Sequence, residues 1–279
     1  MEAHRGRGIT LSEMDSAATP YELTRLTRTG EVTRSSDLLV TEAPVEFRLG
    51  GVPLAVLMRT PGHDEELGLG FAITEGIVLS PAEVAGVVPA GDPDDGDRWS
   101  LALSEGVAVD PEQFRRNLYT TSSCGVCGKA SIDAVRVAAL RPPSGPRVTV
   151  ETLFGLVDTM QAAQHSFAAT GGIHGAALFT ADGELIVLRE DIGRHNAVDK
   201  VVGYASRLEW PIGERILLIS GRVSFEMVQK AAVAGIPVIA AVSAASSLAV
   251  ELAEELGLTV VGFLRDDSCN VYTDPGRVV

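Results

Sequence analysis

The pattern of apolar and polar positions predicts paired strands in the first half of the chain. The sequence becomes strand-like from Tyr21, and the alternation is clearest at 45–49, where Gly50-Gly51 indicates a turn into a second strand. A helix follows, because Leu67 and Phe71 are spaced to share one helical face. The expected elements are strands Val45–Leu49, Val52–Met58 and Trp99–Leu103 and a helix over His63–Ile77.

The second half predicts helices and strands that alternate to form a mixed sheet. A helix and an antiparallel hairpin come first, and further helix–strand pairs follow. The strands of these pairs are continuously apolar, which is typical of strands covered by helices on both faces. The expected helices are Glu151–Phe167, Asn196–Arg207, Phe225–Ala234 and Leu248–Leu256, and the expected strands are Ala176–Phe179, Leu185–Leu188, Ile216–Ile219, Val238–Val242 and Thr259–Leu264.

These patterns indicate an α/β chain, α+β overall, with two domains. The segment RPPSGPR at 141–147 separates them, because its prolines cannot continue the helix expected over Ile132–Leu140. We expect a disordered leader over residues 1–18 and a smaller N-terminal α+β domain over residues 19–140, ending in a cysteine-containing loop and helix. A C-terminal α/β domain with a mixed sheet is expected over residues 149–279.

Charge and composition narrow the range of partners. The net charge of −14 repels nucleic-acid phosphates, although the charges of a single pocket can still favour a small anionic cofactor. The acidic tract GDPDDGD at 91–97 is expected to be a solvated hairpin tip. The longest weakly polar run, Ile236–Val250, is too short and too polar to span a bilayer, and the N-terminus lacks the apolar region of a secretory signal. Three cysteines are too few for a disulfide framework, so free thiols and a cytoplasmic location are expected.

Cys124 and Cys127 form a C-x-x-C pair in the stretch TTSSCGVCGKAS. A structural zinc usually needs four ligands, and neither Cys269 nor the histidines stand at a spacing that completes such a site. A thioredoxin-like pair would follow a buried strand, whereas the residues before Cys124 are polar. The flanking glycines and Lys129 favour a mobile loop with a reactive thiolate. Two buried structural cysteines are the remaining alternative, and Cys269 receives no role.

Polar segments also lie at the ends of predicted strands. In REDIGRHNAVDK at 189–200, Arg194 and the first N–H groups of the helix would form an anion site, or the segment is a helix cap with a solvated charged face. GGIHG at 171–175 permits close approach of the backbone to a ligand, or forms only a tight turn. Ligands of α/β folds gather outside the carboxyl ends of the strands. SGRVS at 220–224 and FLRDDS at 263–268 are therefore binding candidates.

Together, these segments resemble the FdhD family of formate dehydrogenase accessory proteins from about Tyr21 to Thr273. The matching blocks are SCGVCG at 123–128, GGIHGAAL at 171–178, REDIGRHNAVDK at 189–200, SGRVSFEMVQKAA at 220–232 and VGFLRDDSCNVYT at 261–273. The resemblance implies a cytidine-deaminase-like fold for the C-terminal domain. Zinc deaminases carry H-x-E and P-C-x-x-C, but the similar places read HGA and GRVS, so we do not expect deamination.

The function that the resemblance implies is that of a sulfurtransferase acting as a sulfur carrier. A cysteine desulfurase would transfer persulfide sulfur to Cys124, with Cys127 assisting. The sulfur would then pass to bis-molybdopterin guanine dinucleotide (Mo-bis-MGD) before this cofactor enters the formate dehydrogenase apo-enzyme. The residues matching the family's cofactor-binding segment are Phe263, Leu264, Arg265, Asp266, Asp267 and Ser268, with Arg222, Ser224 and His195 as further candidates.

The alternative function is a non-catalytic molybdenum cofactor chaperone for formate dehydrogenase, in which the cysteines only adjust the loop. Neither function implies a structural metal, nucleic-acid binding or a membrane. The sequence leaves open whether the protein forms a homodimer, which desulfurase it meets and whether Cys127 is essential.

Overall fold

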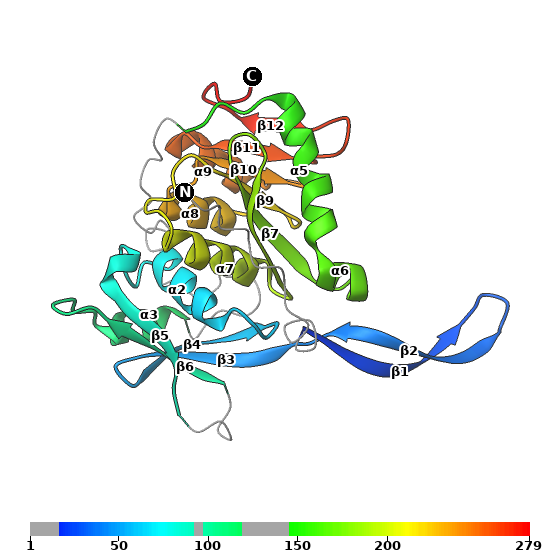
Figure 1. The fold of residues 1–279 in the computed structure, drawn as a ribbon, viewed down its shortest axis with the longest axis horizontal. Coiled ribbons are helices and arrows are strands. Elements are labelled where there is room, and N and C mark those ends of the chain that lie inside the picture. Colours follow the sequence, from blue (N-terminus) through cyan, green and yellow to red (C-terminus); the bar gives the residue numbers. More distant parts are fainter. Residues whose placement is uncertain (1–16, 92–96, 119–144) are drawn as a thin grey trace, which may run out of the picture.

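The computed structural model describes residues 17–91, 97–118 and 145–279 and has mixed α+β architecture (Figure 1). A four-stranded sheet and a six-stranded sheet form the body, and a two-stranded ribbon projects from it. The expected fold class is confirmed. Cys124, Cys127 and the helix expected over Ile132–Leu140 lie outside the described residues.

The first part of the chain builds the ribbon and the smaller sheet. The ribbon pairs β1 with β2, and the smaller sheet has the order β4-β3-β6-β5 with the helix α2 packed on it. The bounds are β1 Ala18–Leu26, β2 Val32–Val40, β3 Ala43–Leu49, β4 Val52–Arg59, α2 Asp64–Thr74, a 3-10 turn η1 Pro81–Glu83, β5 Val84–Pro89, β6 Arg98–Leu103 and α3 Pro111–Leu118.

The hairpin of β3 and β4 forms as the sequence predicts. Gly50 and Gly51 both have positive φ, at 56° and 82°, which is the backbone that a tight hairpin turn requires. β5 and β6 are antiparallel and joined through the acidic tract, as expected of a hairpin, although residues 92–96 are not described.

The second part of the chain builds the larger sheet, in the order β12-β11-β10-β9-β7-β8. β9, β10 and β11 are parallel, whereas β7, β8 and β12 run antiparallel to their neighbours, so the predicted mixed sheet is confirmed. The bounds are α5 Val150–Ala163, α6 His165–Thr170, β7 His174–Phe179, β8 Leu185–Asp191, α7 Arg194–Ser206, β9 Ile216–Ile219, α8 Phe225–Ala234, β10 Val238–Ala241, α9 Ser247–Leu256, β11 Thr259–Gly262 and β12 Asn270–Thr273.

Successive residues of the central strands point into two different hydrophobic layers. In β9, Leu217 and Ile219 join the cluster formed with α7, α8 and α9, whereas Ile216 and Leu218 join the cluster formed with α5. This follows from the two-residue period of a strand, and it explains why continuously apolar strands require helices on both faces. Figure 1 shows α5 on one side of the sheet and α7 and α8 on the other.

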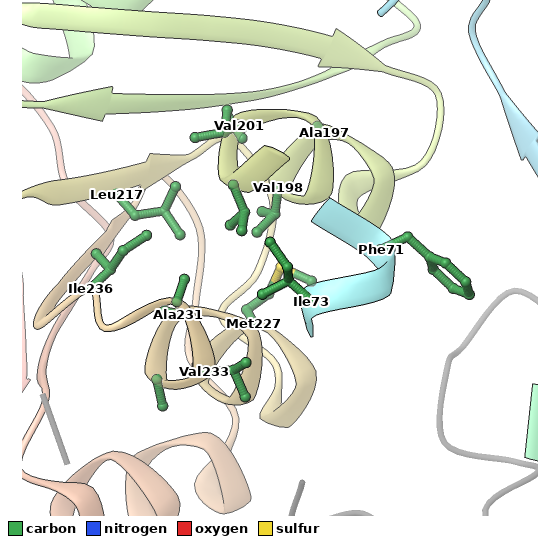
Figure 2. Packing of buried hydrophobic residues seen from close by; sticks show 14 of the residues in the cluster. Phe71, Ile73, Ala197, Val198, Val201, Leu217, Met227, Ala231, Val233 and Ile236 are labelled. Atoms are coloured by element: carbon green, nitrogen blue, oxygen red, sulfur yellow. The ribbon is translucent and has the colours of Figure 1, made fainter. Parts of the chain in front are cut away.

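The two sheets are joined where α2 crosses α7. A Cβ placed on Gly70 would lie 1.8 Å from the Asp199 carbonyl oxygen, and one placed on Gly203 would lie 1.9 Å from the Glu66 carbonyl oxygen. The two helix backbones therefore touch, which only glycine permits at these positions. In Figure 2, Ile73 of α2 points toward Val198 and Met227 of the larger core, whereas Phe71 points away from them.

Several boundaries differ from those predicted. The helix expected over Glu151–Phe167 is broken at Gln164 into α5 and α6, because the Glu190 carboxylate accepts the N–H groups of Ser166 (2.8 Å) and Phe167 (2.7 Å) and starts a new helix there. The last parallel strand ends at Gly262, before Leu264. The pattern of apolar and polar positions did not predict β1, β2, β5, α3 and β12 as individual elements.

No helix in the described ranges is long and apolar enough to cross a membrane.

The glycine crossing leads to a stability prediction. Gly70→Ala should lower the free energy of unfolding by at least about 2 kcal/mol, because the added methyl group cannot fit without separating α2 from α7. Gly155→Ala in α5 is the matched control, since a Cβ there meets nothing within 4 Å. It should be neutral or slightly stabilising. Urea denaturation of both variants measures the difference, and equal midpoints would contradict the proposed backbone contact.

Candidate functional site

The carboxyl ends of β9, β10 and β11 meet at one edge of the larger sheet and carry the polar segments predicted there. Backbone hydrogen bonds join neighbouring loops. Val223 N–H donates to Ala244 O at 2.9 Å, and Phe263 N–H donates to Ser243 O at 3.0 Å. Residues 220–224 and 263–268 therefore lie on the same edge, with the loop after β10 between them. An edge of this kind is where α/β proteins bind ligands.

The segment 263–268 is a surface turn anchored by one buried side chain. Leu264 is fully buried in the cluster around α5, so only its backbone could face a ligand. Phe263 has a left-handed φ of 50°, and the residue is 42% exposed at the rim of the sheet. Arg265 N–H donates to Ser268 O at 2.9 Å, and the four residues 265–268 are exposed. Phe263, Asp266 and Asp267 are thus exposed to solvent, whereas Arg265 Nη1 donates to the carbonyl oxygens of Val242 and Leu264.

His195 and Ser224 meet at the opposite part of this edge, around Glu226. The Ser224 hydroxyl donates to Glu226 Oε2 at 2.7 Å, and His195 Nε2 lies 3.8 Å from the same oxygen. Burial favours the neutral acid, but the His195 ring and the Ser224 hydroxyl outweigh it and lower the pKa of Glu226 to about 2. Glu226 is therefore ionised at neutral pH and holds both candidates in place. Arg222 is exposed and lies beside them in the chain.

His174 of the GGIHG segment lies at the same end of the sheet. It is the first residue of β7, and its Nδ1 is 3.5 Å from Ser220 Oγ at the end of β9. The same hydroxyl accepts the Gly175 N–H at 3.0 Å. Burial, together with Arg194 and His195, lowers the pKa of His174, so its imidazole is neutral at pH 7. In the sequence His174 is a lone histidine, and the residues that surround it here come from two other elements.

Most charges of REDIGRHNAVDK are buried in pairs, so the segment is not a solvated helix face. Arg189 donates to Glu66 of α2 through Nε (2.6 Å) and Nη2 (2.8 Å). Asp191 pairs with Lys200 Nζ at 2.7 Å, and both side chains are almost completely buried. Buried ions must be paired because desolvation is costly. These residues join the two sheets.

Asp199 belongs to a second buried network, which connects α2, α7 and α8. Lys230 Nζ donates to both Asp199 oxygens at 2.9 Å and to the Thr74 hydroxyl at 2.8 Å. Glu75 lies 3.0 Å from the same ammonium. Burial opposes the charge, but the two carboxylates raise the pKa of Lys230 above its usual value, which keeps the ammonium charged.

Arg194 and His195 are the members of this segment that remain at the sheet edge. Arg194 Nε is buried and has no hydrogen-bond partner in the part of the chain that the structure describes, whereas the buried His195 Nε2 has Glu226 Oε2 as its neighbour at 3.8 Å. Leaving a buried donor unpaired costs about 1–3 kcal/mol. The unpaired Arg194 Nε is therefore consistent with the anion site that the sequence suggests at the start of α7.

The thiol pair Cys124 and Cys127 lies outside the described residues, so its predicted chemistry stays a prediction. Cys269 is partly buried, and burial raises the pKa of its thiol, which disfavours a reactive thiolate. Within the described ranges, no group of three or more histidine, cysteine or carboxylate side chains could hold a metal ion.

The protein therefore belongs to the class of α+β proteins whose larger sheet has an edge suited to ligand binding. Cationic, imidazole and aromatic side chains line this edge. The FdhD/NarQ family profile matches residues 40–279, and the chain belongs to this family. It is 52% identical to the sulfur carrier protein FdhD of Streptomyces coelicolor, over 90% of this chain and 92% of that protein. It is 47% identical to the protein of the same name from Mycobacterium tuberculosis, over 94% and 99% of the two chains.

The fold is also found in a solved structure. A protein from Desulfotalea psychrophila, assigned as a formate dehydrogenase accessory protein, superimposes with a TM-score of 0.75. The two sequences are 23% identical, and the alignment covers 94% of this chain and all of that one. At this identity the match concerns the fold alone.

The pairing of Glu66 with Arg189 predicts a pH-dependent stability. Burial favours the neutral acid, but the hydrogen bonds from Arg189 and His63 lower the pKa of Glu66 to about 2. The stabilisation is complete above the ordinary pKa of 4.5 and is lost as pH falls from there toward 2. Glu66→Gln should therefore lower the free energy of unfolding by about 3 kcal/mol at pH 7, and this deficit should shrink toward pH 3.

Glu65→Gln is the control for this prediction, on the same turn of α2. Its partner Arg207 is exposed, so the change should cost less than about 1 kcal/mol at any pH. Chemical denaturation at pH 7, 5 and 3 compares the two variants. A deficit of Glu66→Gln that does not change with pH would show that the loss comes from packing and not from the ion pair.

Proposed function

We propose that this protein is a sulfur carrier that accepts persulfide sulfur from a cysteine desulfurase and transfers it to Mo-bis-MGD before the cofactor enters formate dehydrogenase. The observation that carries the proposal is the C-G-V-C pair at 124–127 in a chain whose relatives at about half identity are named sulfur carriers. The cytoplasm, where thiols stay reduced, is the compartment that suits this chemistry.

The loading step is a thiol exchange. The Cys124 thiolate attacks the outer sulfur of the desulfurase persulfide, a new S–S bond forms, and the desulfurase cysteine leaves as a thiolate. No oxidant is needed, because the sulfane sulfur moves from one thiol to another. The rate of such an exchange depends on the thiolate fraction and on access to the attacked sulfur. Lys129 and the glycines around the pair support both requirements, and Cys127 assists as a neighbouring thiol.

The cargo would bind at the edge of the larger sheet, on residues 263–268. The exposed Phe263 ring offers a stacking face for a flat heterocycle, and Asp266 and Asp267 offer carboxylates to the N–H groups of guanine. Arg265, whose Nη1 is held by the carbonyl oxygens of Val242 and Leu264, would offer its other N–H groups to phosphate oxygens. Leu264 holds the turn from below through its buried side chain.

Incubation with a cysteine desulfurase and cysteine tests the proposal. The intact mass should increase by one sulfur atom, and peptide mapping should place that atom on Cys124. Cys124→Ala should accept no sulfur and should fail to activate formate dehydrogenase, whereas Cys269→Ala is the control and should load normally, because its thiol has a raised pKa.

The alternative, a non-catalytic cofactor chaperone, predicts a different result. Replacing both Cys124 and Cys127 would then leave activation of formate dehydrogenase intact, while Arg265→Ala would still weaken binding of the cofactor. Full activation by the double variant would therefore reject sulfur transfer.

A further inference from the structure

The two-stranded ribbon of β1 and β2 lies outside both hydrophobic cores. Its strands pair over nine residues each, from Ala18 opposite Val40 to Leu26 opposite Val32. No residue between 18 and 40 belongs to either core cluster of the described ranges. An isolated two-stranded hairpin is only marginally stable in water. The fold therefore gains little from the ribbon, which projects from the body in Figure 1.

The ribbon carries apolar side chains that face solvent on both of its sides. Those that are between 41% and 71% exposed are Tyr21, Leu26, Val32, Leu38 and Leu39. Directly opposed residues share a face of a ribbon, so Leu26 and Val32 form an apolar pair at the tip. Leu38 lies on the same face as this pair, whereas Tyr21 and Leu39 lie on the other face. Both faces of the ribbon can therefore bury apolar surface against a partner.

The tip of the ribbon is basic, although the whole chain has a net charge of −14. Arg25, Arg28 and Arg34 are exposed, and Glu31 is the single acidic residue between Arg25 and Arg34. None of the three arginines has an ion-pair partner within the described ranges. Such a tip attracts an acidic surface of another molecule, and salt screens this attraction.

The base of the ribbon lies beside the ligand-binding edge of the larger sheet. The helix α6 packs against both strands, and a Cβ placed on Gly172 would be 3.7 Å from Val40 Cγ1. His174, two residues after Gly172, begins β7 at that edge. Phe167 of α6 is also exposed, so the apolar surface extends from the ribbon to this helix. A protein bound to the ribbon would therefore lie next to the edge from which the cargo leaves.

We propose that the ribbon of β1 and β2 is the docking element for the apo-enzyme of formate dehydrogenase, which would bind it through an acidic surface with apolar side chains. The proposal rests on the proposed function for the identity of this partner. Each face of the ribbon measures about 30 Å by about 10 Å, from the spacing of residues and strands. The two faces together offer about 600 Å², somewhat less than the roughly 800 Å² per partner of a stable complex. This area suits a transient complex that separates after the cofactor has been delivered.

Biolayer interferometry with apo-formate dehydrogenase, purified from cells that cannot make the cofactor, tests the docking. Leu26→Ser combined with Val32→Ser should weaken binding to the full-length protein by at least about tenfold, because the apolar pair at the tip is lost. Leu79→Ser combined with Leu208→Ser is the matched control, since these residues are equally exposed but lie outside the ribbon. The control should bind like the unmodified protein. Equal affinities of the two double variants would overturn the proposal.

The charge of the tip is tested by the salt dependence of the same binding. Arg28→Ala combined with Arg34→Ala should weaken binding strongly at about 50 mM salt and much less at about 300 mM, where screening is stronger. Arg207→Ala combined with Arg215→Ala removes two surface arginines elsewhere and should have no effect. A loss of the same size in this control would show that net charge governs binding and would contradict docking on the ribbon.

Two measurements on the Leu26 and Val32 double variant separate docking from folding and from self-association. Its thermal midpoint should equal that of the unmodified protein, because neither residue belongs to a core cluster. Its molar mass by light scattering should also be unchanged. A variant with a changed molar mass would assign the ribbon to a contact between two copies of this chain and would overturn the proposal.

Persulfide loading of Cys124 by the desulfurase is measured separately on the same variant. Normal loading together with lost binding of the apo-enzyme would support docking on the ribbon. Lost loading with unchanged binding of the apo-enzyme would assign the ribbon to the desulfurase and overturn the proposal. If the unmodified protein binds the apo-enzyme through the ribbon but accepts no sulfur, the sulfur-carrier proposal alone is rejected.

Discussion

The contact between the backbones of α2 and α7 is the constraint on which the rest of the molecule depends. Gly70 and Gly203 allow the two helices to touch, so that the helix packed on the four-stranded sheet is also part of the core of the six-stranded sheet. At this separation no water remains between the helices. Polar groups near the crossing must therefore find partners within the protein.

The buried ion pairs follow from this closeness. Arg189 of β8 reaches Glu66 of α2, and Lys230 of α8 reaches Asp199 of α7 and Glu75 at the end of α2. Ion pairs therefore connect β8 and α8 to α2, and α8 to α7. Breaking one partner of such a pair leaves an uncompensated buried charge, which is far more costly than losing a surface pair. Ion pairs therefore connect the two sheets, and the burial of apolar surface is the main favourable term in folding.

The contact between α2 and α7 also determines which residues of α7 remain accessible to a ligand. Along α7, Asn196 and the residues after it, except Tyr204, are buried in contacts with α2 and the sheet, and Arg194 and His195 lie at the rim. The loops after β9, β10 and β11 are joined to one another there by backbone hydrogen bonds, and Gly221 after β9 packs against the Arg194 side chain. A ligand at this edge would therefore rest on side chains whose supporting elements are rigidly packed, which is the arrangement that precise recognition requires.

By itself, the sequence determined the order and type of the central elements and the position of the polar loops. Continuous apolar strands such as Ile216–Ile219 and the glycines at helix ends are local signals that do not depend on distant residues. It also indicated the family, which the family profile confirms, and it made Phe263–Ser268 a binding candidate. Only the tertiary structure decided which charges of REDIGRHNAVDK are structural, because their partners Glu66, Thr74 and Lys230 lie on other elements. The break at Gln164 depends in the same way on Glu190, and a pattern within one segment cannot contain such a contact.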